Sequence, residues 1–171
     1  ILLNAFFAMS ELAIVSARRA RLQQRADAGS SGARVALDLS DDPTRFLSTV
    51  QIGITLVGIL AGAFSGATLA ESFAVYLEGR GVSTAAAEPL ALFVVVLALT
   101  FLSLVVGELV PKRIALAHAD GVAAHVAPII NFIARAAHPA VATLQWSTEF
   151  ATRALGVDAD RKAGVTDEEI N

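Results

Sequence analysis

Two acidic side chains lie inside long apolar stretches of this sequence, where burial of a charge is unfavourable. Glu11 lies in the stretch from Ile1 to Ala17, and Glu108 lies in the segment SLVVGELVPKRIAL. An unpaired carboxylate at the centre of a membrane helix costs about 2.5–3.5 kcal/mol on insertion scales, so each acid needs a neutralising partner. Three partners are open: a proton, the ammonium of Lys112 four residues after Glu108, or a cation bound between helices.

Polar and small residues accompany the acids on three apolar stretches. On the first stretch, Asn4 and Glu11 are seven residues apart and share a helix face. The second carries polar residues followed by glycines at 58, 62 and 66, and the third carries Thr100 and Ser103 before its acid. Carboxylate, amide, hydroxyl and backbone oxygens are the ligands that magnesium and calcium prefer. The sequence therefore predicts a hard-cation site formed by Asn4, Ser10, Glu11, Gln51, Thr55, Gly107 and Glu108.

Pro111 strengthens the prediction at Glu108. It lies four residues after Gly107 and has no N–H, so it leaves the Gly107 carbonyl without its helical hydrogen bond. The absence of a side chain at Gly107 lets another helix or an ion approach this backbone. Non-helical backbone at membrane depth is tolerated where it lines a cavity, and a freed carbonyl beside a carboxylate offers two oxygens to a cation.

Each feature also has a purely structural explanation. Glycines at every fourth position are typical of close helix packing, and hydroxyls in a membrane helix usually bond to their own i−4 carbonyl. Glu11 precedes Arg18 and Arg19 by about two turns and is then an acid near the membrane interface. Glu108 is then a helix-end acid paired with Lys112.

The overall composition is that of a membrane protein. Of the 171 residues, 55% are hydrophobic and 17% charged, and the mean hydropathy is +0.62. The net charge of −3 and the lack of a long basic tract argue against a nucleic-acid partner. Without cysteine, disulfides and thiolate metal sites are excluded. Because the chain opens on an isoleucine in an apolar run and stops at GVTDEEIN, we expect a piece of a longer protein.

We predict an all-α membrane protein with three transmembrane helices per subunit, at about residues 1–17, 46–70 and 89–110, each near the roughly 20 apolar residues that a bilayer requires. Basic residues are concentrated between the first two spans, whereas only Arg80 lies between the second and third. The positive-inside rule therefore places the first loop in the cytoplasm and the N-terminus outside.

The segments between and after the spans are predicted to be helical. The first loop is expected to form a cytoplasmic hairpin, with ARRARLQQRADA and ARVALDLSDD separated by GSSG, and residues 71–88 a short outside helix ending at GRG. Residues 113–156 contain Arg135 and prolines at 128 and 139, which favours a bent amphipathic juxtamembrane belt helix with Trp146 as its interfacial anchor. Its histidines at 118, 125 and 138 are expected in surface or packing roles, and the C-terminus is expected in the cytoplasm.

Several motifs resemble those of one transporter family. GELVPK at 107–112 resembles the G-E-x-x-P-K signature that ends the third span of the CorC/CNNM (cyclin M-like) magnesium transporters. NAFFAMSELAIVSARRARL at 4–22 is similar to the first span of that family, and TVQIGITLVGILAG at 49–62 to its second. VTDEEI looks like the start of the family's linker to cytosolic CBS-pair domains. The GITL form resembles a divergent bacterial branch.

The resemblance implies a homodimer in the bacterial inner membrane. Residues 1–156 would be the transmembrane domain, and residues 157–171 would begin the linker to regulatory CBS domains, for which ATP is the expected nucleotide. It also implies an inward-facing acidic cavity that holds magnesium, with Glu108, Gly107 and Asn4 at family positions. The chain departs from the family at Ala8, Ile54 and Gly58, where polar residues are common.

Two functions are compatible with these observations. The first is a secondary transporter of divalent cations, exporting magnesium, with sodium as a candidate coupling ion. The alternative is a non-transporting dimeric membrane anchor that presents cytosolic CBS sensor domains. An enzyme is not expected, because the sequence shows no nucleophile with an adjacent base and no catalytic metal motif.

Overall fold

A computed structural model describes residues 1–154 of the chain, apart from the side chains at 65, 145, 149, 153 and 154. All regular elements within these residues are helices, which confirms the predicted all-α class. The chain divides into two compact units, residues 1–135 and a unit that begins at residue 136.

The chain begins with a short apolar helix and a helical pair. α1 (Leu2–Ser16) ends where Ala17 adopts extended backbone, and α2 (Arg19–Asp27) and α3 (Ser31–Asp41) follow and contact each other. Gly29 adopts a φ of +96°, which glycine reaches without strain, and Ser30 caps α3 by accepting a hydrogen bond from the N–H of Ala33. The two helices lie where the sequence predicted a helical pair.

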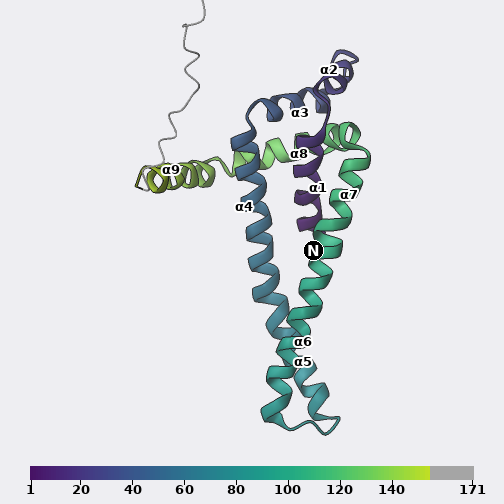
Figure 1. The fold of residues 1–171 in the computed structure, drawn as a ribbon, viewed down its shortest axis with the longest axis vertical. Coiled ribbons are helices and arrows are strands. Elements are labelled where there is room, and N and C mark those ends of the chain that lie inside the picture. Colours follow the sequence, from purple (N-terminus) through teal and green to yellow (C-terminus); the bar gives the residue numbers. More distant parts are fainter. Residues whose placement is uncertain (155–171) are drawn as a thin grey trace, which may run out of the picture. The chain divides into compact units, whose positions relative to one another are not determined.

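The second apolar stretch forms one long rod (Figure 1). α4 (Pro43–Ala61), the π-helical turn η1 (Gly62–Gly66) and α5 (Ala67–Glu78) follow without a break. Asp42 caps the start by accepting a hydrogen bond from the N–H of Arg45, and Pro43 occupies the first turn, where its missing N–H is not needed. The helix continues beyond the predicted membrane span at 46–70, because neither glycine nor proline interrupts residues 67–78. The rod ends at the expected GRG turn.

The third apolar stretch forms a second rod, which packs against α5. It consists of α6 (Thr84–Leu104), the π-helical turn η2 (Val105–Leu109) and α7 (Val110–Ala117). This rod extends beyond both ends of the predicted membrane span at 89–110. Pro111 lies in the first turn of α7, after a π-helical turn in which the N–H of Val110 donates to the carbonyl of Val105, so the rod continues through it.

The segment predicted as a bent belt helix at 113–156 contains the end of α7 and two further helices. Residues 113–117 continue α7, and the chain breaks at His118 before α8 (Ala119–Ala136). α9 (His138–Ala154) belongs to the second unit and exposes Leu144, Trp146 and Phe150. Residues 155 and 156 and the predicted linker at 157–171 lie outside the described residues.

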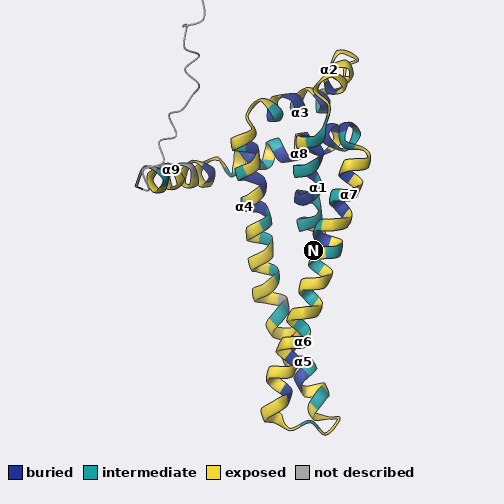
Figure 2. Cartoon of the chain, in the orientation of Figure 1, coloured by how far each residue is buried: buried dark blue, intermediate teal, exposed yellow. Residues whose placement is uncertain are grey.

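The core of the first unit lies where α1, α2, α3, α7, α8 and the start of α4 meet (Figure 2). Its buried residues include Phe7, Leu22, Phe46, Val50 and Ile130. Farther along the two rods, large apolar side chains are exposed, among them Leu56, Ile59, Phe64, Phe93, Leu97 and Phe101. Exposed apolar surface of this extent indicates contact with lipid or with another protein.

Within residues 1–154, the two rods are the helices long and apolar enough to cross a membrane. At about 50 Å each, by the 1.5 Å rise per residue, they exceed a hydrocarbon core of about 30 Å, so they tilt or extend beyond it. α1 has 15 residues, fewer than the roughly 20 that a span requires. The three-span layout therefore stays a prediction.

Candidate functional site

A cavity of about 870 Å³ lies between the N-terminal end of α1, the α4–η1 segment and the α6–η2 segment. Apolar side chains and glycines form most of its wall. Its polar lining consists of Asn4 on α1 and of Thr100, Ser103 and Glu108 on the second rod. One carboxylate, one amide and two hydroxyls therefore share a single cavity.

Asn4 connects α1 to η2. Its Nδ2 donates a hydrogen bond to the carbonyl oxygen of Gly107 at 3.3 Å. This is the carbonyl that Pro111 was predicted to free, and the amide supplies a replacement donor. The Oδ1 atom of Asn4 is buried and accepts no hydrogen bond from any described residue. A buried acceptor without a partner costs about 1–3 kcal/mol, so a donor or cation bound there would be stabilised.

Glu108 forms an ion pair with Lys112. The Nζ atom of Lys112 lies 2.7 Å from Oε1 of Glu108, and the two side chains are 33% and 40% exposed respectively. The residues are one turn apart, with the acid first, which is the favourable order on a helix. Of the neutralising partners considered from the sequence, the structure shows the lysine.

The glycine stripe on the first rod borders the cavity. Gly58, Gly62 and Gly66 all line it, and a Cβ added at any of them would meet no atom within 4 Å. Within the described part of the chain, these glycines are therefore not helix-packing contacts. Gly53 differs, because a Cβ there would lie 2.5 Å from the ring of Phe7, which rests directly on this glycine.

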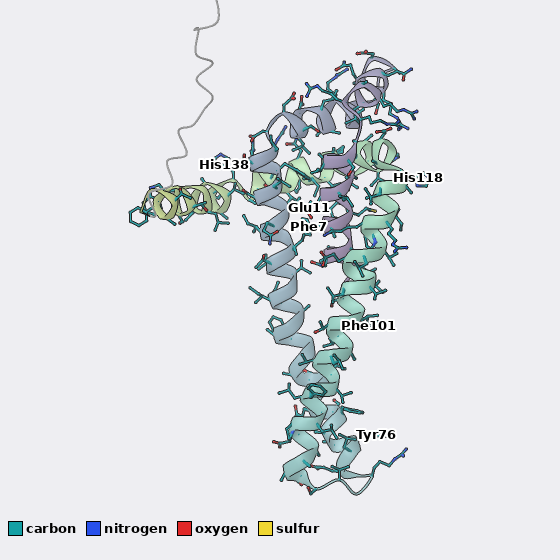
Figure 3. The ribbon with its side chains drawn as sticks, viewed as in Figure 1. Phe7, Glu11, Tyr76, Phe101, His118 and His138 are labelled. Carbon is teal, nitrogen blue, oxygen red and sulfur yellow. The ribbon has the colours of Figure 1, made fainter. Side chains whose placement is uncertain are left out.

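Five of the predicted ligands do not line the cavity, and one of them, Gly107, contacts it only through the hydrogen bond from Asn4. Ser10 is fully buried and donates a hydrogen bond to the carbonyl of Phe6 on its own helix. Glu11 is partly buried on the part of α1 between α4 and α7 (Figure 3) and makes no ion pair with a described residue. Gln51 and Thr55 are exposed. The metal-binding role of these residues stays a prediction.

The structure brings Asn4, Gly107 and Glu108 together and adds two hydroxyls to them. Thr100 and Ser103 were absent from the predicted ligand set, although both precede Glu108 on the same rod. Their spacing along the helix was the available signal, since residues three and about eight apart share a face. The described residues contain no group of three or more His, Cys, Asp or Glu side chains that could hold a metal. A cation in this cavity would therefore have one carboxylate, with amide, hydroxyl and water oxygens as its other ligands.

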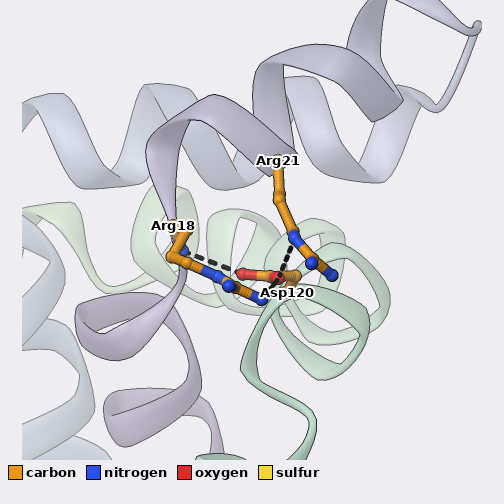
Figure 4. Close-up of polar contacts among 3 residues, drawn as sticks. All are labelled: Arg18, Arg21 and Asp120. Carbon is orange, nitrogen blue, oxygen red and sulfur yellow. Dashed lines mark hydrogen bonds and ion pairs between the residues drawn. The ribbon is translucent and has the colours of Figure 1, made fainter.

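Asp120 fixes the opposite end of α1 (Figure 4). It lies in the first turn of α8 and is only 9% exposed. It accepts a hydrogen bond from the backbone N–H of Arg18 at 2.8 Å and another from the Arg18 guanidinium at 3.2 Å, and Nε of Arg21 lies 3.8 Å away. The backbone hydrogen bond, followed by the two guanidinium groups, lowers the pKa of Asp120 in spite of its burial. This contact joins the α1–α2 turn to α8.

Comparison with known proteins shows a consistent set of relatives. Residues 1–171 match the family model described as the cyclin M transmembrane N-terminal domain. UPF0053 protein sll0260 of Synechocystis sp. is 46% identical over 99% of this chain and 38% of its own length. The polyamine export protein of Haemophilus influenzae is 29% identical over 99% of this chain and 39% of its own length. UPF0053 protein YhdP of Bacillus subtilis is 30% identical, over 92% and 36% respectively. The chain thus spans about two-fifths of the length of these curated relatives.

Proposed function

The chain belongs to the cyclin M transmembrane-domain family, and on this premise we propose that it is the membrane part of a secondary transporter that exports cations, with Mg²⁺ as the cargo. The family consists of transporters and membrane modules rather than enzymes. This membership identifies a membrane protein and agrees with the two long apolar rods.

The cavity beside Glu108 is the observation that supports this function best. The carboxylate of Glu108 supplies the charge, Asn4 supplies a buried acceptor without a partner in the described part of the chain, and the hydroxyls of Thr100 and Ser103 add neutral oxygens. Mg²⁺ gives up its water reluctantly and usually binds through one or two carboxylates while retaining several waters. A volume of about 870 Å³ accommodates such a partly hydrated ion. Binding of a partly hydrated ion also suits this chain because it has apolar or small residues at Ala8, Ile54 and Gly58, where the family commonly has polar ones.

The proposed orientation indicates the side of the membrane from which cargo would enter the cavity. With the N-terminus outside and the C-terminus in the cytoplasm of a bacterial cell, Glu108 lies toward the cytoplasmic end of its rod, where cargo would enter. Sodium moving inward is the candidate counter-ion. We further propose a homodimer, supported by the exposed apolar surface of the rods, and regulation by nucleotide-binding CBS domains in the remainder of the full-length protein.

Flux in liposomes tests the transporter. Full-length protein is reconstituted, and Mg²⁺ movement is followed with a trapped fluorescent indicator. Glu108→Gln removes the charge and keeps the shape, so flux should fall at least tenfold. Glu71→Gln is the matched control, because Glu71 is exposed on α5 and does not line the cavity. Transport by Glu108→Gln at the unmodified rate contradicts the proposed site.

Polyamine export is a second candidate. The volume of the cavity falls in the roughly 300–1,000 Å³ range of organic-ligand pockets, and its largely apolar wall suits a methylene chain between ammonium groups. One relative carries the name polyamine export protein. The same liposomes, loaded with 1,4-diaminobutane in place of Mg²⁺, show which cargo is moved.

A non-transporting membrane anchor is the competing function. It predicts that neither Mg²⁺ nor the diamine binds saturably to the purified protein. It also predicts that Gly62→Leu disrupts the dimer through a packing contact with the second copy, since a Cβ there would meet no other described part of the chain within 4 Å beyond its own helical turn. Saturable binding that depends on Glu108 excludes this alternative.

A further inference from the structure

We infer that the ammonium of Lys112 pairs with the carboxylate of Glu108 whenever no cargo is bound there, and so acts as a tethered counter-cation. The competition between this ammonium and cargo sets the affinity of the cavity for cargo. The inference rests on the proposed function and deepens it. It assigns to the lysine a role in the transport cycle that the cation site itself does not require.

The geometry places Lys112 and the cargo on the same carboxylate. Glu108 lines the cavity, whereas Lys112 does not and reaches Oε1 from the next helical turn at 2.7 Å. A carboxylate has two oxygens with several acceptor positions, so both cations can approach it. Two cations bound to one carboxylate lie within a few ångströms of each other and repel strongly in a partly buried site. Cargo binding and the lysine contact therefore oppose each other.

The side chain of Lys112 is suited to exchange places with cargo. Its ammonium is a compact charge on a flexible four-carbon stem, unlike the planar fork of arginine. The side chain is 33% exposed, so water is available to the ammonium when it leaves Glu108. When cargo leaves in turn, the returning ammonium neutralises a carboxylate that is unfavourable alone in an apolar setting.

This exchange has a consequence for ion coupling. A carrier with one acidic site must neutralise that site both when it carries cargo out and when it returns. Because Lys112 can neutralise Glu108 on the return, no second cation has to bind at Glu108 itself, and sodium as the candidate coupling ion would bind elsewhere. Without the lysine, the return depends on an external cation such as sodium.

Calorimetric titration tests the competition directly. Full-length protein in detergent at pH 8 is titrated with MgCl₂ and, separately, with 1,4-diaminobutane. Lys112→Met keeps the length of the side chain and removes its charge, and should tighten binding of at least one titrant by tenfold or more. Lys112→Arg keeps the charge and should bind as weakly as the unmodified protein. Arg113→Gln is the matched control, because Arg113 is exposed and makes no ion pair with a described residue.

Binding seen in Lys112→Met alone also supports the inference. The inference is overturned if Lys112→Met binds both titrants with the same affinity as Arg113→Gln or with a lower affinity. It is also overturned if none of the variants binds either titrant. Circular dichroism and gel filtration establish that each variant is folded, and Lys112→Arg provides a second test if Lys112→Met is not.

Flux measurements separate this inference from the proposed function. In liposomes, flux by the Lys112→Met variant should depend on outside sodium more strongly than flux by the unmodified protein, because only the variant needs a second cation at Glu108. Absence of flux in the unmodified protein contradicts the proposed function, while tighter binding by Lys112→Met would still support the tethered cation. Flux in the unmodified protein together with sodium-independent flux in Lys112→Met overturns the inference alone.

Discussion

Replacement of Asp120 by asparagine should loosen the junction between the α1–α2 turn and α8. The N–H of Arg18 would still have an oxygen acceptor, but a neutral one. A hydrogen bond to a charged group contributes about 1.5–3 kcal/mol and a neutral one about 0.5–1.5 kcal/mol, so this contact loses roughly 1–1.5 kcal/mol. The guanidinium groups of Arg18 and Arg21 are largely exposed, and pairs of that kind add about 0.2–1 kcal/mol. The expected destabilisation is therefore about 2 kcal/mol at neutral pH.

The pH dependence of this loss follows from the lowered pKa of Asp120. A carboxyl whose pKa is lower in the folded state stabilises that state above its unfolded-state pKa, which is about 3.9. The contribution disappears as the pH falls through the folded-state pKa. The stability difference between the unmodified protein and Asp120→Asn should therefore be constant from about pH 7 to pH 5 and shrink below about pH 4.

Thermal unfolding in detergent micelles, followed by circular dichroism, measures the difference. A change of about 2 kcal/mol lowers the melting temperature by roughly 4–8 °C for a domain of this size. Asp38→Asn is the control, because Asp38 is exposed on α3 and makes no ion pair with a described residue, and it should leave the melting temperature unchanged. Equal melting temperatures for Asp120→Asn and Asp38→Asn, or a difference that persists unchanged at pH 3, would refute this account of the junction.

Three further substitutions test other contacts. Gly32→Ala should lower the melting temperature by several degrees in the same assay, because its Cβ would lie 2.0 Å from the backbone oxygen of Ala124, whereas Gly121→Ala, with no atom within 4 Å, should not. Gly58→Leu should leave stability unchanged but reduce liposome flux severalfold, since the side chain would enter the cavity from an otherwise open wall. Asn4→Leu should weaken Mg²⁺ binding about tenfold in calorimetry, because it removes both the acceptor in the cavity and the donor to the η2 carbonyl; unchanged affinity would contradict that role.

The sequence predicted the helices better than it predicted their ends. Long apolar stretches require helices in lipid, because every backbone group must be satisfied within the segment, and the two rods follow from this rule. Both rods continue beyond the predicted membrane spans, past a charged residue in one and a proline in the other. Glu71 does not interrupt a helix that lacks a breaker until Gly79, and Pro111 is accommodated by the π-helical turn before it. Neither effect is visible from hydropathy.

Some predictions about the site depend on one helix alone, and others depend on how two helices pack. Glu108 and the Gly107 carbonyl could be singled out from the sequence because the reasons lie within one helix: the charge is unfavourable in lipid, and Pro111 has no N–H to give. The face of α1 that packs against α4 depends instead on the shapes of the side chains on both helices. The ring of Phe7 occupies the space above Gly53, and this contact accompanies the complete burial of Ser10 on the same helix. The periodicity of α1 shows that Asn4 and Glu11 share a face, but only the structure shows that, of these two polar residues, Asn4 lines the cavity and contacts η2. That contact uses the Nδ2 of Asn4 and leaves its Oδ1 buried without a partner among the described residues, so in the proposed transporter the packing of α1 and the binding of a cation would meet at Asn4.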